Sequence, residues 1–326
     1  MRVLVVSSYP PRHCGIGAYA RVQVEAMRQK GDDVTVLSPP DGDGDVRVPF
    51  HGGRPFRRAA RDGASFDRIL VHFQPSLFYR PRAPLSKIGT SLGLQWLVRR
   101  RPQTEILVHE ADPPVRWRPD YVLLRRAFKR GRLLFHSEAE RRQLENAYHV
   151  SVNARIVPHA EGVRVAGVTR ADARRRLGIP DHAPLFVCAG FLHPDKGFER
   201  AVDAWRRAGR PGRLAIVGSI RDRTTRNLAY EAKLRDEVAD EDGVTFLDGY
   251  VSDDDFDAWI AAADLFVLPY RRSWSSGALA RAQLLGTPAA VADTGGLAEQ
   301  AGPRDAVFRT DDELTNLFVS RIEAPA

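Results

Sequence analysis

The stretch RVLVVSSYPPRHCGIGAYARVQVEAMRQKGDDVTVLS, residues 2–38, decides the fold class of the chain. It begins with a continuous apolar run at Val3–Val6, which is typical of a buried strand in a parallel sheet. Apolar residues then recur at helical spacing over Ile16–Met27, and Gly31 marks the end of that helix. A second apolar run follows at Val34–Leu37. The stretch therefore predicts a strand–helix–strand unit with its two strands in parallel.

The same alternation of strands and helices continues along the chain, pauses near residues 161–168, and then restarts. Further strands of the first half are expected at Ile69–Phe73, Ile106–His109, Leu133–His136 and Arg155–Val157. Strands of the second half are expected at Leu185–Ala189, Leu214–Val217, Val244–Leu247, Leu265–Leu268 and Ala289–Ala292. We therefore predict an α/β protein of two tandem Rossmann-like domains, residues 1–165 and 166–326. Because ligands bind beyond the carboxyl ends of parallel strands, we expect the two domains to face each other across an interdomain cleft.

Composition and charge restrict the compartment and the partners. The chain has 326 residues, of which 43% are hydrophobic, and no apolar run reaches the roughly 18 residues that span a bilayer. The apolar start is too short for a signal peptide, and two distant cysteines, Cys14 and Cys188, give no disulfide framework, so we expect a cytoplasmic protein. The net charge is +8, but residues 1–160 carry 27 basic and 15 acidic side chains. This surplus indicates either an anionic acceptor or membrane surface, or simply solubilising arginines.

The first loop places two glycines, Gly15 and Gly17, at the start of a helix. Glycines there let backbone N–H groups approach a phosphate or a sugar, although they also serve simple packing. The segment GIGAYA at 15–20 fits the dinucleotide pattern, but the loop before it is long and no acidic residue follows the strand Val34–Leu37. We therefore disfavour a nicotinamide-dependent oxidoreductase.

Several segments, in order along nearly the whole chain, carry a resemblance to a known family. After the first loop they are HFQPSLF (72–78), VHEADPP (108–114), FHSEAE (135–140), VPHAEG (157–162), AGFLHPDKGFERAVDAW (189–205), LAIVGS (214–219), FLDGYVSDDDFDAWIAAADLFVLPY (246–270) and GALARAQLLGTPAAVADTGGLAE (277–299). The chain resembles the large retaining glycosyltransferase family often called family 4, which has the GT-B architecture. The resemblance implies transfer of a hexose from a nucleoside diphosphate sugar, with retention and without a metal, and an N-terminal domain that binds the acceptor.

The resemblance also implies site residues. Gly15 and Gly17 match the glycine-rich loop near the donor phosphates, and His109 matches a histidine that contacts the donor sugar. Lys196 matches a lysine that binds the donor diphosphate, where a fixed ammonium stabilises the charge of the leaving group. Structural alternatives remain for each, namely packing glycines, a histidine bonded to backbone and a solvated lysine. The expected nucleotide contacts of the second domain are Gly190, Lys196, Ser219, Gly249, Tyr250, Ser275, Ser276, Gly277 and Arg281.

Three positions depart from the family pattern. Phe191 stands where an arginine is usual, and Ser273 and Arg281 stand where the family has two glutamates. A guanidinium has donors only, so Arg281 cannot accept hydrogen bonds from a ribose and is expected to pair with an acid or to reach a phosphate. The helix start at Ser275–Gly277 can still bind a phosphate through N–H groups, and Arg271 or Arg272 could supply the missing positive charge.

No metal site is expected. The histidines that flank the strands, His13, His72, His136 and His159, lack metal-ligand spacing, and Asp253–Asp255 reads as the charged first turn of a helix. We expect no cofactor besides the nucleotide-sugar co-substrate, and no nucleic-acid partner.

The acceptor remains open. A basic segment, Tyr121–Arg132, together with Trp96–Arg101, predicts either a face for an anionic or lipid-linked acceptor at the membrane surface or ordinary helices that cover the sheet. The C-terminal segment Asp311–Ile322 is the only candidate for the helix that in this family crosses back to the first domain. Two alternative functions are a nucleotide-sugar epimerase and a non-catalytic, glycosyltransferase-like partner subunit.

Overall fold

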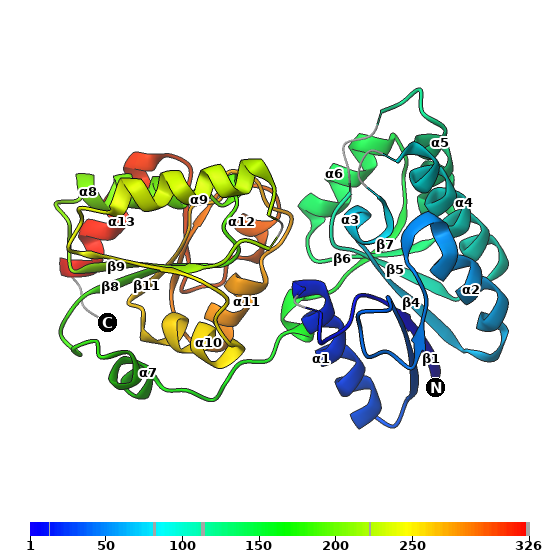
Figure 1. Ribbon diagram of the computed structural model, residues 1–326, viewed down its shortest axis with the longest axis horizontal. Coiled ribbons are helices and arrows are strands. Elements are labelled where there is room, and N and C mark those ends of the chain that lie inside the picture. The colour runs from blue at the N-terminus through cyan, green and yellow to red at the C-terminus, as the bar shows by residue number, and fades with distance from the viewer. Residues whose placement is uncertain (13, 81–82, 112–114, 222, 324–326) are drawn as a thin grey trace. The chain divides into compact units, whose positions relative to one another are not determined.

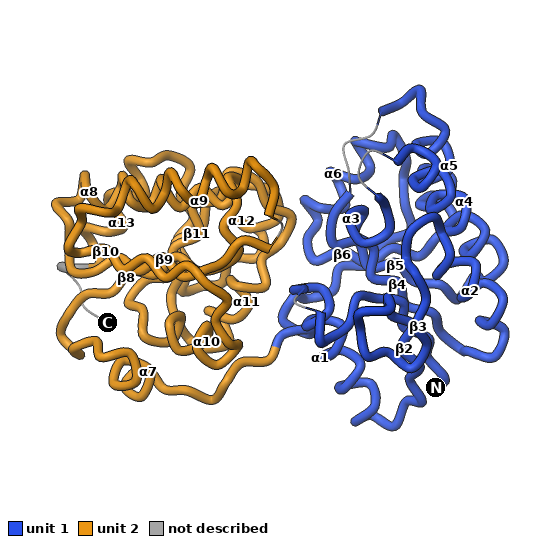
Figure 2. The backbone as a smooth tube through the Cα atoms, viewed as in Figure 1, with its two compact units in different colours: residues 1–163 blue, residues 164–326 orange. Residues whose placement is uncertain are grey.

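The computed structural model describes residues 1–323 apart from 13, 81–82, 112–114 and 222. The chain forms two compact units, residues 1–163 and 164–326 (Figure 2). The division falls two residues before the boundary that the sequence predicts. Each unit contains one parallel sheet with helices packed on it, as the strand–helix alternation predicts (Figure 1).

The first unit is built on a seven-stranded parallel sheet in the order β3-β2-β1-β4-β5-β6-β7. Its strands are β1 (Arg2–Val6), β2 (Asp33–Ser38), β3 (Val46–Arg47), β4 (Arg68–Phe73), β5 (Thr104–Val108), β6 (Arg132–Phe135) and β7 (Asn153–Ile156). Its helices are α1 (Gly15–Gln29), α2 (Arg54–Asp62), α3 (Pro75–Phe78), α4 (Pro84–Arg100), α5 (Pro119–Arg130) and α6 (Glu138–Tyr148). Strand β1 pairs with β2 on one side and β4 on the other, so the strand order reverses there.

The second unit is built on a six-stranded parallel sheet in the order β10-β9-β8-β11-β12-β13. Its strands are β8 (Leu185–Ala189), β9 (Arg213–Gly218), β10 (Val244–Asp248), β11 (Leu265–Leu268), β12 (Ala289–Ala292) and β13 (Ala306–Phe308). Its helices are α7 (Arg170–Leu177), α8 (Phe198–Arg207), α9 (Thr225–Val238), α10 (Asp253–Ala262), α11 (Gly277–Leu284), α12 (Leu297–Gln300) and α13 (Asp311–Glu323). Strand β8 lies between β9 and β11 and is the second reversal point.

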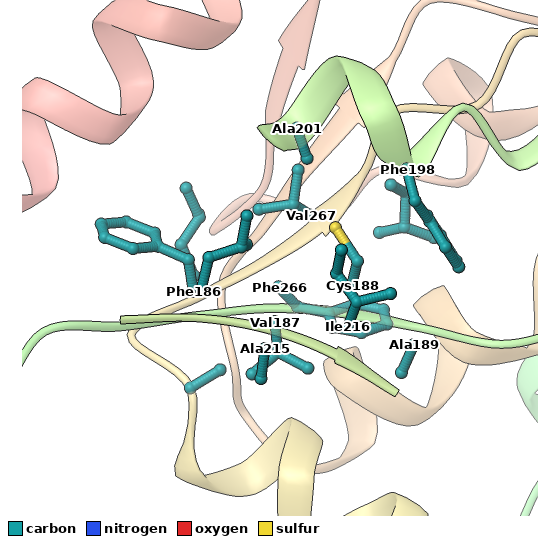
Figure 3. Packing of buried hydrophobic residues seen from close by; sticks show 14 of the residues in the cluster. Phe186, Val187, Cys188, Ala189, Phe198, Ala201, Ala215, Ile216, Phe266 and Val267 are labelled. Carbon is teal, nitrogen blue, oxygen red and sulfur yellow. The ribbon is translucent and has the colours of Figure 1, made fainter. Parts of the chain in front are cut away.

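The core of the second unit follows from the alternation of side chains along β8. Phe186 and Cys188 point to the face that carries α8, with Phe198 and Ala201, while Val187 points to the opposite face (Figure 3). All are buried, because helices cover both faces of the sheet. Burial raises the pKa of the Cys188 thiol, and both Cys188 and Cys14 are free cysteines.

The C-terminal helix α13 packs within its own unit. Phe318 is buried with its ring centroid 4.6 Å from that of Phe186, and Asp311 forms an ion pair of 2.7 Å with Arg200 on α8. The expectation that this segment crosses back to the first domain is therefore wrong. An apolar face that fits α8 decides its position, and the sequence does not show which surface that face will meet.

Candidate functional site

The loops that follow β8, β9 and β10 are joined by backbone hydrogen bonds. The N–H of Leu192 donates to the carbonyl of Ser219 at 2.9 Å, and the N–H of Gly249 donates to that of Gly218 at 3.0 Å. Gly190 has a φ of +143°, and a Cβ on Gly218 would lie 1.9 Å from the carbonyl oxygen of Gly190. Only glycine allows this approach. The structure thus brings three predicted contacts, Gly190, Ser219 and Gly249, together at the carboxyl edge of the sheet.

Lys196 ends a short 3-10 helix, Pro194–Lys196, which is pressed against the end of β11. The N–H of Arg271 donates to the carbonyl of Asp195 at 2.8 Å, and a Cβ on Gly197 would lie 2.5 Å from the carbonyl oxygen of Pro269. Gly197 has a φ of +59° and is the N-cap of α8. The loop is therefore fixed by backbone contacts, and it places the Lys196 ammonium 3.7 Å from the ring centroid of Tyr270.

Both acidic and basic side chains act on His193 in this loop. His193 lies partly exposed, and its pKa is lowered by burial and by the charges of Arg226, Lys196 and Arg221, against the opposing effect of Asp195. One carboxylate and three basic side chains therefore act on the His193 imidazole, and Arg226 is itself paired with Asp195.

Helix α11 follows β11 along the chain and is capped by Ser276. The Ser276 hydroxyl accepts from the N–H of Leu279 at 3.3 Å, and the N–H of Ser276 itself donates to the Gln300 side chain at 2.9 Å. Because the N–H of Ser276 already donates to Gln300, it is not available to a phosphate, although the sequence predicts phosphate binding at Ser275–Gly277. The N–H groups of Gly277 and Ala278 remain in the first turn, because the N–H of Ala280 makes the first bond within the helix.

The carboxyl edge of the first sheet carries four histidines. His109 directly follows β5, and its Nε2 lies 3.0 Å from Nδ1 of His72, which belongs to β4. His136 follows β6, and its ring centroid is 4.3 Å from that of His159. Tyr19 of α1 contacts all four, with ring centroids 5.3 to 5.8 Å apart. We call these five residues the histidine cluster.

Burial keeps the histidine cluster uncharged. It lowers the pKa of His72 to about 3 and that of His136 to about 4, it lowers the pKa of His109 well below its ordinary value, and it raises the pKa of Tyr19. Burial, together with His136, lowers the pKa of His159 to about 3. Neutral imidazoles can hydrogen-bond hydroxyl groups as donor or acceptor. Among the described residues, no three His, Cys, Asp or Glu side chains are arranged to hold a metal ion.

The two glycines of the first loop differ in their surroundings. A Cβ on Gly17 would lie 3.3 Å from the backbone nitrogen of Tyr9, whereas a Cβ on Gly15 would meet nothing within 4 Å. Packing thus accounts for Gly17 but not for Gly15. Beside this helix start, the hydroxyls of Ser7 and Ser8 are buried and have no hydrogen-bond partner among the described residues. His13 and residues 112–114, which the sequence also singled out, lie outside the described part of the chain.

Comparison with known proteins agrees with this geometry. Residues 183–323 match the sequence model of a family described as Glycosyl transferases group 1. The chain superimposes over 100% of its length on 90% of sucrose-phosphate synthase from Thermosynechococcus elongatus, with a TM-score of 0.73 and 18% identity. It matches Anabaena HepE, solved in complex with UDP-glucose, over 99% of this chain and 90% of that one, with a TM-score of 0.70 and 15% identity. The chain has the GT-B fold of glycosyltransferases.

A curated relative is similar over part of this GT-B chain. It is the GDP-mannose-dependent monoacylated alpha-(1-6)-phosphatidylinositol monomannoside mannosyltransferase of Corynebacterium glutamicum, 31% identical over 172 residues, which are 48% of this chain and 42% of the relative. The chain thus spans less than half the length of this curated relative. Within the described residues, no helix is both long and apolar enough to cross a membrane.

Two arginines that the resemblance brought into question are engaged inside the second GT-B unit. Arg281 pairs with Asp257 and lies 3.2 Å from Asp253, both on α10. Asp257 is buried and also accepts the N–H of Ala166 at 2.7 Å. Arg281 has therefore taken the first of the two roles that the sequence allowed, pairing with an acid, and this argues against its direct contact with a nucleotide. Arg271 binds Glu199 at 2.6 Å, so it is not free to replace the missing arginine charge.

The structure adds residues that the sequence did not single out. Tyr19 and Tyr270 hold the predicted residues His109 and Lys196, and Glu199 and Gln300 use up N–H groups of the predicted site. One available signal was the recurrence of histidine at the ends of four consecutive strands. No signal in the sequence links Gln300 to Ser276. The predicted contact Tyr250 is 61% exposed, so it is accessible to a ligand.

Proposed function

We propose that the chain is a metal-independent retaining glycosyltransferase, which transfers a hexose from a nucleoside diphosphate sugar to a sugar, lipid-linked or small-molecule acceptor. The observation that carries the proposal is the Lys196 ammonium, held at the carboxyl edge of the second sheet without a carboxylate partner among the described residues. The group 1 match, over the residues that surround this ammonium, supports the choice of a nucleoside diphosphate as its ligand.

Lys196 acts on the leaving group in this proposal. As the bond between the anomeric carbon and the phosphate oxygen breaks, negative charge grows on the diphosphate. An ammonium already in place stabilises that charge without reorganisation, as do the N–H groups of Gly277 and Ala278 at the start of α11. The acceptor hydroxyl attacks from the same face, forms the new bond to the anomeric carbon, and gives its proton to the departing phosphate oxygen.

His109 acts on the sugar in this proposal. Its lowered pKa keeps the imidazole neutral, so it binds hydroxyl groups of the donor sugar by hydrogen bonding rather than by charge. The contact with Nδ1 of His72 engages its Nε2, which leaves Nδ1 of His109 for the substrate. Because neither imidazole is protonated at neutral pH, we expect no ionisation of the cluster in the catalytic pH range.

We assign binding of the acceptor to the first unit, which carries the surplus of basic residues. Helix α5 packs its apolar residues Leu124 and Phe128 inward, as an ordinary covering helix does. Arg125 donates to the carbonyls of Tyr148 and His149, so it serves the structure of the unit. The exposed candidates for contact with an anionic or lipid-linked acceptor are Arg126, Lys129 and Arg130.

A second candidate function is a non-catalytic partner subunit, favoured by the internal pairing of Arg281 and by Phe191 at the usual arginine position. A nucleotide-sugar epimerase is the third. Incubation with a panel of nucleotide sugars in chelator separates them. Release of free sugar and nucleoside diphosphate indicates a transferase active site, and a change of sugar identity without an acceptor indicates an epimerase. Recovery of every donor unchanged supports the partner subunit and contradicts the proposal.

A further inference from the structure

The ammonium of Lys196 lies over the face of an aromatic ring. Its Nζ is 3.7 Å from the ring centroid of Tyr270, which follows the buried strand β11 and is 1% exposed. A cation at this distance is attracted by the electron-rich face, and the attraction grows when the pair is partly shielded from water. Because Tyr270 is immobilised by its burial, the ring fixes where the end of a flexible lysine side chain lies.

Lys196 differs in this from two arginines of the same unit, Arg271 and Arg226. Arg271 is bound to Glu199, and Arg226 to Asp195 at 3.1 Å. Asp195 is next to Lys196 in sequence, but its carboxylate lies within ion-pair distance of Arg226 and His193. Among the described residues, Lys196 forms no ion pair with a carboxylate. A ring holds an ammonium without cancelling its charge and without accepting all of its N–H groups, so the charge stays available to an anion.

The hydroxyl of Tyr270 is not part of the contact between the ring and Lys196. It is buried, has no hydrogen-bond partner among the described residues, and lies 4.0 Å from where a Cβ on Gly190 would be. Lys196 contacts the ring and not the hydroxyl, so removal of the hydroxyl leaves the aromatic face in place. The variant Tyr270→Phe is therefore a matched control for variants that remove or invert the face.

We propose that Tyr270 is a positioning residue that holds the Lys196 ammonium, still charged, at the place where it binds the diphosphate of the donor. The identity of the anion rests on the proposed function, whereas the contact between Lys196 and the ring does not. Neighbouring arginines such as Arg271 are held in place by carboxylates, which offset their positive charge. The ring of Tyr270 also holds Lys196 in place, but it leaves the positive charge of Lys196 available to an anion.

The test compares three replacements of Tyr270 in the full chain. Tyr270→Leu removes the face, Tyr270→Phe keeps it, and pentafluorophenylalanine at position 270 keeps the shape but inverts the polarity of the face. Pyrophosphate and UDP are titrated by calorimetry in chelator. We expect affinity about tenfold lower with leucine or the fluorinated ring and within twofold of the parent with phenylalanine. Thermal unfolding identifies any variant that does not fold. If Tyr270→Leu does not fold, the fluorinated ring, which keeps the shape of the side chain, still tests the proposal.

A second measurement tests the contact without any ligand. The rate of acylation of Lys196 by an amine-reactive reagent is followed by mass spectrometry, with Lys233, an exposed lysine of α9 paired with Glu237, as internal reference. We expect faster acylation of Lys196 with leucine or the fluorinated ring than with phenylalanine or tyrosine. Equal rates in all four proteins would overturn the positioning role, whether or not a diphosphate binds. If diphosphate affinity falls in Lys196→Ala but not with the fluorinated ring, the positioning role is overturned and the proposed function stands.

Discussion

Acidification should unfold the first unit at a pH where the second remains folded. The structure buries His72 and His136 as neutral imidazoles, with pKa values of about 3 and about 4. In the unfolded chain each has a pKa of about 6.5. As the pH falls, these histidines take up protons in the unfolded state before they do so in the folded state. The free energy of unfolding is therefore highest above pH 6.5 and decreases as the pH drops below that value.

The size of the effect follows from the two pKa values. At pH 5, each of these two histidines lowers the free energy of unfolding by about 2 kcal/mol relative to pH 8. The pair together lowers the free energy of unfolding of the first unit by about 4 kcal/mol. His109 and His159, whose pKa values are also lowered, shift the balance in the same direction. Domains are typically stable by only about 5–15 kcal/mol. The first unit should therefore lose much of its stability between pH 6.5 and pH 5.

Hydrogen exchange with mass spectrometry measures this unit by unit. At pH 8 and pH 5, with exchange times corrected for the intrinsic pH dependence, peptides from β4, β5 and β6 should lose protection on acidification. Peptides from β8 and β9 serve as the internal reference, because the buried histidines of the described chain, His72 and His136, both belong to the first unit. Equal changes in protection for both units, or histidine pKa values near 6.5 by proton NMR, would refute the reasoning.

Three further predictions concern single features of the structure. Lys196→Ala should lower turnover by roughly 100-fold or more and weaken diphosphate binding, because the charge acts most on the departing group; Lys233→Ala is the control, and unchanged kinetics in the folded variant would make Lys196 a surface lysine. Arg281→Glu should destabilise the second unit by about 3 kcal/mol in chemical denaturation, because the buried Asp257 would then face a like charge. The same change should not improve donor binding, and a gain in affinity for a uridine or guanosine donor would contradict this prediction. Liposomes with anionic lipid should sediment the protein at low salt and release it at high salt, and the effect should vanish when three exposed basic residues become Gln; equal behaviour of neutral liposomes would assign the surplus to solubility. Those residues are Arg126, Lys129 and Arg130.

Local sequence was sufficient for most of the fold. The apolar runs at Val3–Val6 and Leu185–Ala189 coincide with β1 and β8 to within one residue, because buried parallel strands need continuous apolar side chains. The short edge strands β3 and β13 were not predicted, since two or three residues give no periodicity. Expected strands ending at His109 and His136 stop one residue earlier, which places both imidazoles in the loops that carry the site.

The candidate site was predictable in kind but not in its pairing. The resemblance to the glycosyltransferase family selected Lys196 and His109, and their positions after predicted strands agreed with that choice. Pairing depends on side chains distant in sequence, and the partner of Arg281 is an aspartate 24 positions away on another helix. Likewise, the four histidines are separated by 23 to 37 residues, and only the strand order β4-β5-β6-β7 brings them together around Tyr19.

Binding of a nucleoside diphosphate in the absence of metal tests the central claim most directly. UDP, GDP and ADP are titrated into the protein by calorimetry in the presence of chelator, with Lys196→Ala in parallel. We predict that at least one of them binds in chelator and that its affinity falls when Lys196 is replaced. Binding that appears only when a divalent metal is added, or that is unaffected by the loss of Lys196, would contradict the account.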